Sequence, residues 1–156
     1  MEKGRQKGRR RRRGGRGSSR SPVLAALDLG TNNCRLLLAV AEPDGTLRVV
    51  DSFSRIVRLG EGVAQTGALS EAAMERTVAA LKVCAEHIKK HRVRHIRAIA
   101  TEACRQAANA QVLIDRVAKE TGIALCVVTT AEEARLAALG CAPLIGADYD
   151  GALAFD

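Results

Sequence analysis

The sequence is poor in aromatic residues and has no long apolar run. Its 156 residues include one Tyr, two Phe and no Trp, so a core has to be built from Ala, Leu, Val and Ile. That length is enough for one domain with its own core. No segment approaches the roughly 20 apolar residues of a membrane-spanning helix, which argues against an integral membrane protein.

The cysteines lack the pattern of a disulfide framework or a metal site. There are five of them, scattered and without a Cys-x-x-Cys pair: Cys34, Cys84, Cys104, Cys126 and Cys141. This usage indicates reduced, mostly packed thiols in a cytoplasmic protein.

Net positive charge is concentrated in residues 1–21. This segment holds ten Lys and Arg and one acid, so it carries +9 while the other 135 residues carry −1. It has almost no apolar side chain to offset the entropy of ordering, so we predict a disordered Arg-rich tail over 1–21 and one domain over 22–156. The short apolar run after the tail is broken by Asp28 and lacks a small-residue cleavage site, which argues against a secretory signal.

The hydrophobic pattern changes period after about residue 60. Runs rich in β-branched and apolar residues come first, with a turn at Pro43-Asp44-Gly45. Apolar residues then recur every three or four positions from Met74 to Ile88, behind a candidate N-cap at Ser70. The expected strands are 23–28, 35–41, 47–57, 95–101, 123–129 and 151–155, and the later helices are 109–120, with Asn109 as the cap, and 130–140.

The order β-β-β-α-β-α-β-α-β predicts an α/β domain. Three antiparallel strands followed by crossovers give a mixed sheet with helices on both faces. Ligands of such sheets collect at loops that leave the strand ends.

The first candidate loop is Asp28-Leu29-Gly30-Thr31-Asn32. Gly30 allows a tight turn and a close approach to an anion, and Thr31, Asn32 and backbone N–H groups can donate to phosphate oxygens. Asp28 is a hard oxygen ligand for a cation. The alternative is an ordinary hairpin turn, since the same residues favour turns.

Two further segments are candidates. Arg105 follows a strand end at Thr101 and can fork onto a phosphate, or be an ordinary surface arginine. Glu133 can activate a water beside a phosphate. Thr130-x-x-Glu133 also fits a capping box, in which Glu133 closes the start of a helix and Glu132 favours its dipole.

His87, His91 and His95 recur every four residues and suggest a metal site. We reject this interpretation, because residues 93–95 should lie beyond the helix end and the neighbouring Lys and Arg would repel a cation.

Together, five segments resemble one family, the exopolyphosphatase / guanosine pentaphosphate phosphohydrolase (Ppx/GppA-type) family, and its N-terminal domain in particular. In order they are ALDLGTNNCRLL, VRLGEGVAQTGALSEAAMERT, AIATEACRQAAN, AEEARLAALG and ALAFD. The resemblance implies a first actin-like ATPase (ribonuclease H-like) domain. The basic tail lies outside it.

The resemblance also implies roles for the candidate residues. Gly30, Thr31, Asn32 and Arg105 would bind phosphate, Asp28 and Asp156 would lie at Mg²⁺ or Mn²⁺, and Glu133 would be the catalytic base. The reaction would release terminal phosphate from inorganic polyphosphate or from guanosine pentaphosphate. Hydrolysis of guanosine pentaphosphate would connect the protein to the stringent response. A homodimer of the full-length protein is a further expectation.

Two features depart from the family pattern. Thr130 and Ala131 stand where glycine usually precedes the acidic run, which stiffens that loop. The sequence also ends at Asp156, where the family continues into a Gly-rich second phosphate loop, so we expect a fragment or truncated reading frame that is inactive alone. The alternative is a polyanion- or nucleic-acid-binding protein that uses its Arg-rich tail and has a catalytically dead domain.

We predict that deleting residues 1–21 flattens the salt dependence of binding to long polyphosphate or DNA, because fewer counterions are released. Turnover of a short substrate in an active, full-length form should hardly change. Binding titrations across salt concentrations and phosphate release from the short substrate test this, and a large loss of that turnover would contradict it.

Overall fold

Alternating apolar and polar residues make the first three strands one antiparallel unit. They are β1 (Val23–Leu29), β2 (Asn33–Ala41) and β3 (Leu47–Ile56). In the computed structural model, which describes residues 21–145, β2 pairs with β1 on one side and with β3 on the other, both antiparallel. The predicted meander is confirmed.

Two parallel strands complete the sheet. β4 (His95–Ala100) pairs with β1, and β5 (Cys126–Val127) pairs with β4, giving the order β3-β2-β1-β4-β5. This mixed sheet agrees with the predicted fold class. The strand expected over 123–129 is shorter in the structure, because only the last two residues of β4, Ile99 and Ala100, have ladder partners on it. The strand expected over 151–155 lies outside the described residues.

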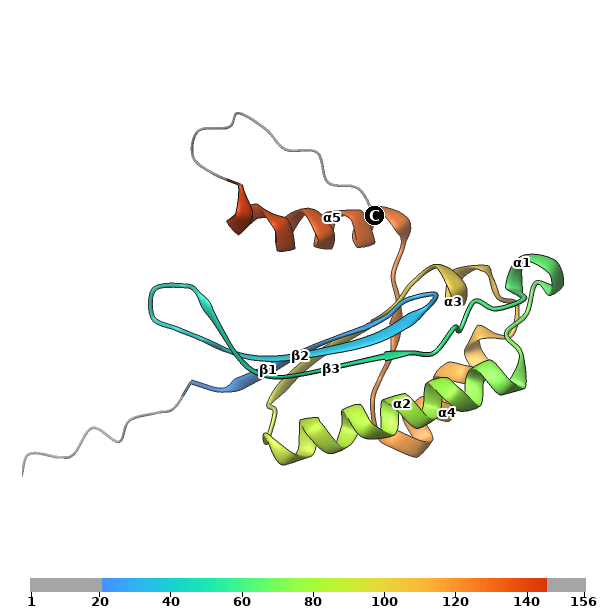
Figure 1. Ribbon diagram of the computed structural model, residues 1–156, viewed down its shortest axis with the longest axis horizontal. Coiled ribbons are helices and arrows are strands. Elements are labelled where there is room, and N and C mark those ends of the chain that lie inside the picture. The colour runs from blue at the N-terminus through green and yellow to red at the C-terminus, as the bar shows by residue number, and fades with distance from the viewer. Residues whose placement is uncertain (1–20, 146–156) are drawn as a thin grey trace, which may run out of the picture.

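Helices lie on both sides of this sheet, as Figure 1 shows. Helices α2 (Glu71–Lys90) and α4 (Ala110–Thr121) cover one face, and α5 (Thr130–Cys141) lies over the other. The short helices α1 (Val63–Thr66) and α3 (Glu102–Gln106) lie near one end of the sheet, and the 3₁₀ helix η1 (Ala142–Leu144) follows α5.

The core lies between the sheet and the α2–α4 pair. Leu27 and Leu38 of the sheet, Leu81 of α2 and Leu113 of α4 are fully buried there. The predicted stripe of α2 is confirmed, since its members from Met74 to Leu81 are buried and Ile88 packs against the core. Burying each such side chain contributes about 1.5–3 kcal/mol.

The two predicted helix caps behave differently. Ser70 caps α2, and its hydroxyl accepts a hydrogen bond from the N–H of Ala73 at 3.2 Å. Asn109 stands at the N-cap of α4, as predicted, but its side chain makes no capping hydrogen bond. Its Oδ1 accepts from the N–H of Leu69 at 2.8 Å and its Nδ2 donates to the carbonyl of Leu69 at 3.0 Å, so it ties the start of α4 to the loop before α2.

The three histidines have different surroundings. His87 Nδ1 and His91 Nε2 lie 2.7 and 2.8 Å from the same oxygen, Oδ2 of Asp51 in β3, whereas His95 begins β4. The hydrogen bond from His87 is the main cause of a lowered pKa for Asp51. The pair of histidines therefore ties the end of α2 to β3.

The described cysteines are all free thiols. Cys34, Cys84 and Cys104 are buried, whereas Cys126 and Cys141 are exposed. The Sγ atoms of Cys34 and Cys84 are 3.9 Å apart, and this contact together with burial raises the pKa of Cys34. No helix in the described part, residues 21–145, combines the length and hydrophobicity needed to cross a membrane.

Polar contacts attach α5 to the sheet, because this helix has no buried residue. Arg97 of β4 donates to Glu132 at 2.6 Å, and Arg135 donates to the same carboxylate. The hydrogen bond from Arg135, followed by the charges of Arg135 and Arg97, lowers the pKa of Glu132 to about 2.

This shift predicts a pH-dependent stability difference between wild type and Glu132→Gln. A carboxylate with a lowered folded-state pKa stabilises the fold above its ordinary pKa near 4.5, and loses that effect as the pH falls toward 2. Wild type should therefore melt at a higher temperature than the variant at pH 6–7, and the difference should vanish near pH 2. Thermal melts of both proteins across this range are the measurement, and a difference that does not change with pH would contradict it.

Candidate active site at the carboxyl ends of the parallel strands

Three chain segments meet where β1, β4 and β5 end. These strands are mutually parallel, so the loops that follow them leave the sheet at the same edge. Between the loops lies a cavity of about 280 Å³. It is lined by Asp28, Gly30, Thr31, Asn32, Asn33, Arg35, Thr101, Glu102 and Glu133.

The loop after β1 is a tight turn that is braced by the backbone around it. Gly30 N–H donates to the carbonyl of Asn33 at 2.9 Å, which closes the turn. The carbonyl of Asn32 accepts from the N–H groups of Val57 and Arg58 at 2.8 and 3.0 Å. These hydrogen bonds fix the backbone of the loop. The side chains of Thr31 and Asn32 are exposed and line the cavity.

A close approach between two chain segments supports the same loop. The N–H of Gly60 donates to the carbonyl of Thr31 at 3.0 Å. A Cβ at position 60 would lie 2.3 Å from Cγ2 of Thr31, which is far inside van der Waals contact. Glycine at position 60 therefore sets the position of Thr31.

The second segment presents Arg105. The N–H of Thr101 donates to the carbonyl of Leu29 at 3.1 Å, which extends the β1–β4 pairing to the start of α3. The carbonyl of Thr101 then accepts from the N–H of Arg105 at 3.1 Å. This short helical turn places Arg105 next to the cavity, with its side chain only 19% exposed.

The third segment presents Glu133, and the predicted cap of α5 is wrong by one residue. The N-cap is Thr129, whose hydroxyl accepts from the N–H of Glu132 at 3.2 Å, so the capping box does not pair Thr130 with Glu133. The carboxylate of Glu133 lies instead at the cavity, where Oε2 accepts from Arg105 at 2.7 Å.

Arg105 joins the second and third segments of the site. One terminal nitrogen donates to Glu133 and, at 2.9 Å, to the carbonyl of Val128, while Nε and the other terminal nitrogen donate to Glu102. Partial burial disfavours the charged form, but the hydrogen bonds that Arg105 donates to Glu133 and Glu102 outweigh it and raise the pKa of Arg105. The hydrogen bond from Arg105 is the main cause of a lowered pKa for Glu102.

The structure brings together all the predicted site residues that it describes. It also adds Asn33, Arg35, Thr101 and Glu102, which the sequence patterns did not identify as site residues. The Glu102–Arg105 spacing of three residues was a usable signal for an ion pair on one helical turn. Arg35 had no such signal, because it comes opposite Asp28 only through the β1–β2 register.

A larger cavity of about 520 Å³ adjoins the site on the α5 side of the sheet. It shares Asp28 and Arg35 with the first cavity, and Leu37, Ile99 and Leu136 contribute apolar walls.

The structure describes one of the two predicted metal ligands. Asp28 is half-buried and lines the cavity, whereas Asp156 lies outside the described residues. Within residues 21–145, no group of three or more His, Cys, Asp and Glu side chains could hold a metal ion. Mg²⁺ bound to phosphates needs only one or two protein carboxylates, so Asp28 fits such an ion.

Comparison with known proteins points to one family. The model of the Ppx/GppA phosphatase family matches residues 39–151. Exopolyphosphatase 2 of Mycobacterium tuberculosis is 39% identical over 131 residues, covering 79% of this chain and 41% of the relative. The chain thus spans about two fifths of the length of the curated relatives it matches.

Two solved structures resemble this chain in both sequence and fold. The Aquifex aeolicus Ppx/GppA family member is 36% identical with a TM-score of 0.73, covering 78% of this chain and 39% of that one. An exopolyphosphatase from Cytophaga hutchinsonii is 35% identical with a TM-score of 0.70, covering 73% of this chain and 36% of that one. With more than half of its residues matched by the family model and its sheet, helices and loops arranged as in these structures, the chain belongs to the Ppx/GppA phosphatase family.

Proposed function

We propose that this chain provides the catalytic half-site of a phosphoanhydride hydrolase that releases terminal phosphate from inorganic polyphosphate. The observation that supports this most directly is the Arg105–Glu133 pair at the cavity below the Gly30–Asn32 loop. It combines a phosphate-binding cation and a carboxylate in one place. Two relatives described above are named exopolyphosphatases, which favours polyphosphate over guanosine pentaphosphate as the first substrate to test.

Each residue has a distinct task in this proposal. Gly30, Thr31 and Asn32 hold oxygens of the terminal phosphate with N–H and side-chain donors. Arg105 donates to the same phosphate and offsets negative charge in the transition state. Glu133 accepts a proton from the water that attacks phosphorus, and the phosphoanhydride oxygen leaves with the shortened chain.

The ion pair of Arg105 suggests how the site is prepared for the substrate. Glu102 and Glu133 keep the guanidinium in place from two sides. A phosphate that binds Arg105 would take over donors now directed at Glu133. The carboxylate would then remain within reach of the attacking water.

A divalent cation fits beside Asp28. Mg²⁺ or Mn²⁺ bound there would neutralise charge on the phosphates. Asp28 would hold the ion from the protein side, together with Asp156 if that residue reaches the site.

The first test replaces Glu133 by Gln, which keeps the size of the side chain but cannot accept the proton. We expect hydrolysis to fall by roughly 10²–10⁴, the usual contribution of a general base. Phosphate release should be measured with polyphosphate and with guanosine pentaphosphate in turn. The protein for this assay is a chimera in which the corresponding C-terminal part of a relative follows Asp156.

Glu132→Gln in the same chimera is the matched control. Its carboxylate binds Arg97 and Arg135 away from the cavity, so this substitution should cost much less activity. If Glu132→Gln is the inactive variant, the base is Glu132 and the proposed register is wrong. If neither change slows hydrolysis, the proposal for Glu133 is wrong.

A second test replaces Arg105 by Lys. A single ammonium cannot reproduce the donors that reach Glu102, Glu133 and Val128 together. We expect the rate of phosphate release to fall by roughly 10²-fold, the scale of losing one donor to the transition state. Arg97→Lys alters a cation that lines the larger, adjoining cavity but not the 280 Å³ one, so it should have a far smaller effect. Equal rates for both variants would contradict the assignment.

A further inference from the structure

The candidate phosphate loop is held from outside by the chain that follows β3. We call residues 57–60 of this chain the bracing segment. The N–H groups of Val57 and Arg58 donate to the carbonyl of Asn32 at 2.8 and 3.0 Å, and that of the glycine at position 60 donates to the carbonyl of Thr31 at 3.0 Å. No residue of the bracing segment lines the 280 Å³ cavity, so the segment acts on the site through the backbone of Thr31 and Asn32.

The bracing segment contains a strained residue. Arg58 has a φ of 48°, in the left-handed region that a residue with a Cβ adopts only at an energetic cost. The side chains on either side of it, Val57 and Leu59, are buried, so both ends of this turn are held in the core. Such strain persists only where the surroundings fix the backbone, so the conformation of Arg58 needs a specific partner.

Arg76 of α2 is that partner. Its Nε donates to the carbonyl of Val57 at 3.1 Å, and one terminal nitrogen donates to Glu61 at 2.8 Å and, in a longer bond, to the carbonyl of Arg58 at 3.4 Å. The two carbonyls belong to the peptide groups before and after Arg58. One guanidinium therefore fixes both peptide planes, and with them φ and ψ of the left-handed residue.

These contacts connect the hydrophobic core with the cavity. Arg76 stands next to Thr77, which is fully buried, so its backbone is fixed by the packing of α2. The peptide group that accepts from Arg76 at the carbonyl of Val57 also donates, through the N–H of Arg58, to the carbonyl of Asn32. Hydrogen bonds that are linked through one peptide group strengthen each other, so the position of the phosphate loop depends on Arg76.

The ion pair of Arg76 with Glu61 is not the contact that distinguishes this arginine. The two side chains are 43% and 60% exposed, and an ion pair between such exposed groups contributes little to stability. The bonds to the two backbone carbonyls are the contacts that a surface arginine has no need to make.

We propose that Arg76 is a positioning residue for the phosphate loop. It holds the bracing segment in its left-handed turn, and that segment holds Thr31 and Asn32 where they meet the terminal phosphate. Arg76 does not line the cavity, so it acts only through these residues. The inference rests on the proposed function for the identity of the ligand.

Replacing Arg76 by Gln in the 156-residue chain tests this without turnover. The probe is tripolyphosphate, and its binding is followed at the amide NMR signals of Thr31 and Asn32. Because Gln cannot fix both peptide groups, amide hydrogen exchange at Val57 and Arg58 should become faster. The affinity at the loop should fall by roughly 10-fold, within the loss of up to about 10²-fold that a misplacement of about 1 Å causes.

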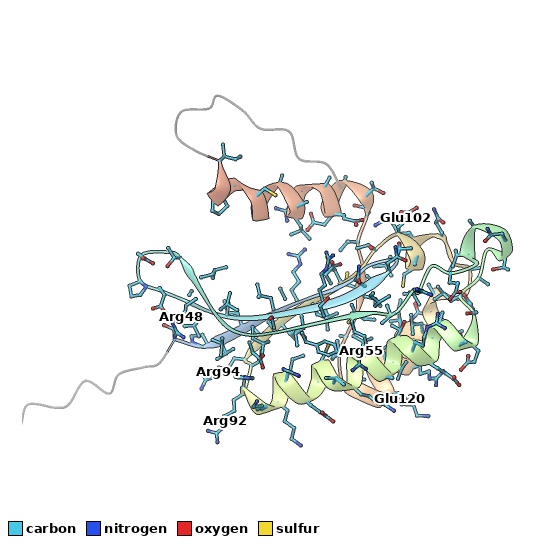
Figure 2. All side chains as sticks on the ribbon, viewed as in Figure 1. Arg48, Arg55, Arg92, Arg94, Glu102 and Glu120 are labelled. Atoms are coloured by element: carbon cyan, nitrogen blue, oxygen red, sulfur yellow. The ribbon has the colours of Figure 1, made fainter. Side chains whose placement is uncertain are left out.

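A second substitution separates positioning from charge and from overall stability. Glycine adopts a φ near 48° without the penalty of a Cβ, so R58G/R76Q should recover most of the lost affinity. The matched control is R76Q/R92G. Arg92 is the other non-glycine residue with a positive φ in the described part of the chain, at 52°, and Figure 2 shows it at the end of the molecule opposite Glu102 of the cavity. This control removes the same charge and the same kind of strain, so its affinity should stay at the level of R76Q.

Three results would overturn the proposal. They are unchanged exchange and affinity in R76Q, no recovery in R58G/R76Q, and equal recovery in both double variants, which would indicate a role in overall stability alone. If thermal melts show that R76Q does not fold, Arg76→Lys replaces it in every variant, since lysine keeps the charge but not the fork. If wild type binds no tripolyphosphate at the loop, the proposed function is contradicted, while the exchange rates at Val57 and Arg58 still decide whether Arg76 holds the bracing segment.

Discussion

The arrangement of the candidate site depends on the hydrogen bonds of one guanidinium, that of Arg105. It contacts Glu102 in its own helical turn, the carbonyl of Val128 after β5, and Glu133 in α5. These contacts connect two loops that are separated in sequence, and they do so at the edge where the β1 loop also ends. Arginine suits this position because its planar fork offers donors in several directions at once, which a lysine does not.

A second dependence is the attachment of α5. This helix buries no residue against the sheet, so its position rests on ion pairs to Arg97 and Arg105. Two adjacent glutamates make different contacts. Glu132 faces Arg97 and Arg135 and holds the helix, while Glu133 faces the cavity. Thr129 supplies the cap, which leaves the Glu133 carboxylate available to the site.

The two ends of the sheet differ in their polar groups. The carboxyl ends of β1, β4 and β5 gather donors and carboxylates around a small cavity. The amino end of β1 adjoins exposed lysines and arginines, and the N–H of Arg94 donates to the carbonyl of Val23 there.

Much of this protein follows from the sequence by itself. Hydrophobic periodicity determines the strand meander, the buried stripe of α2 and the parallel crossovers, because burial of apolar side chains acts along a local repeat. Short motifs likewise predicted Gly30, Thr31, Asn32, Arg105 and Glu133 as candidate site residues, and these lie together in the structure. Local rules failed where a side chain has two possible partners. The Asn109 side chain binds Leu69 instead of an N–H of α4, and Thr129 rather than Thr130 supplies the side-chain cap of α5.

Only the tertiary structure decided which side chains meet. Arg35 comes opposite Asp28 through strand register, Asp51 receives both His87 and His91, and the cations at the end of α2 come to lie beside the start of β1. Asp28 and Arg35 face each other across the short β1–β2 turn, whereas the other residues are far apart in sequence, and no periodicity predicts that they meet. They arise because hydrogen bonding between strands fixes the position of whole segments at once, and the side chains of the site take their neighbours from that register.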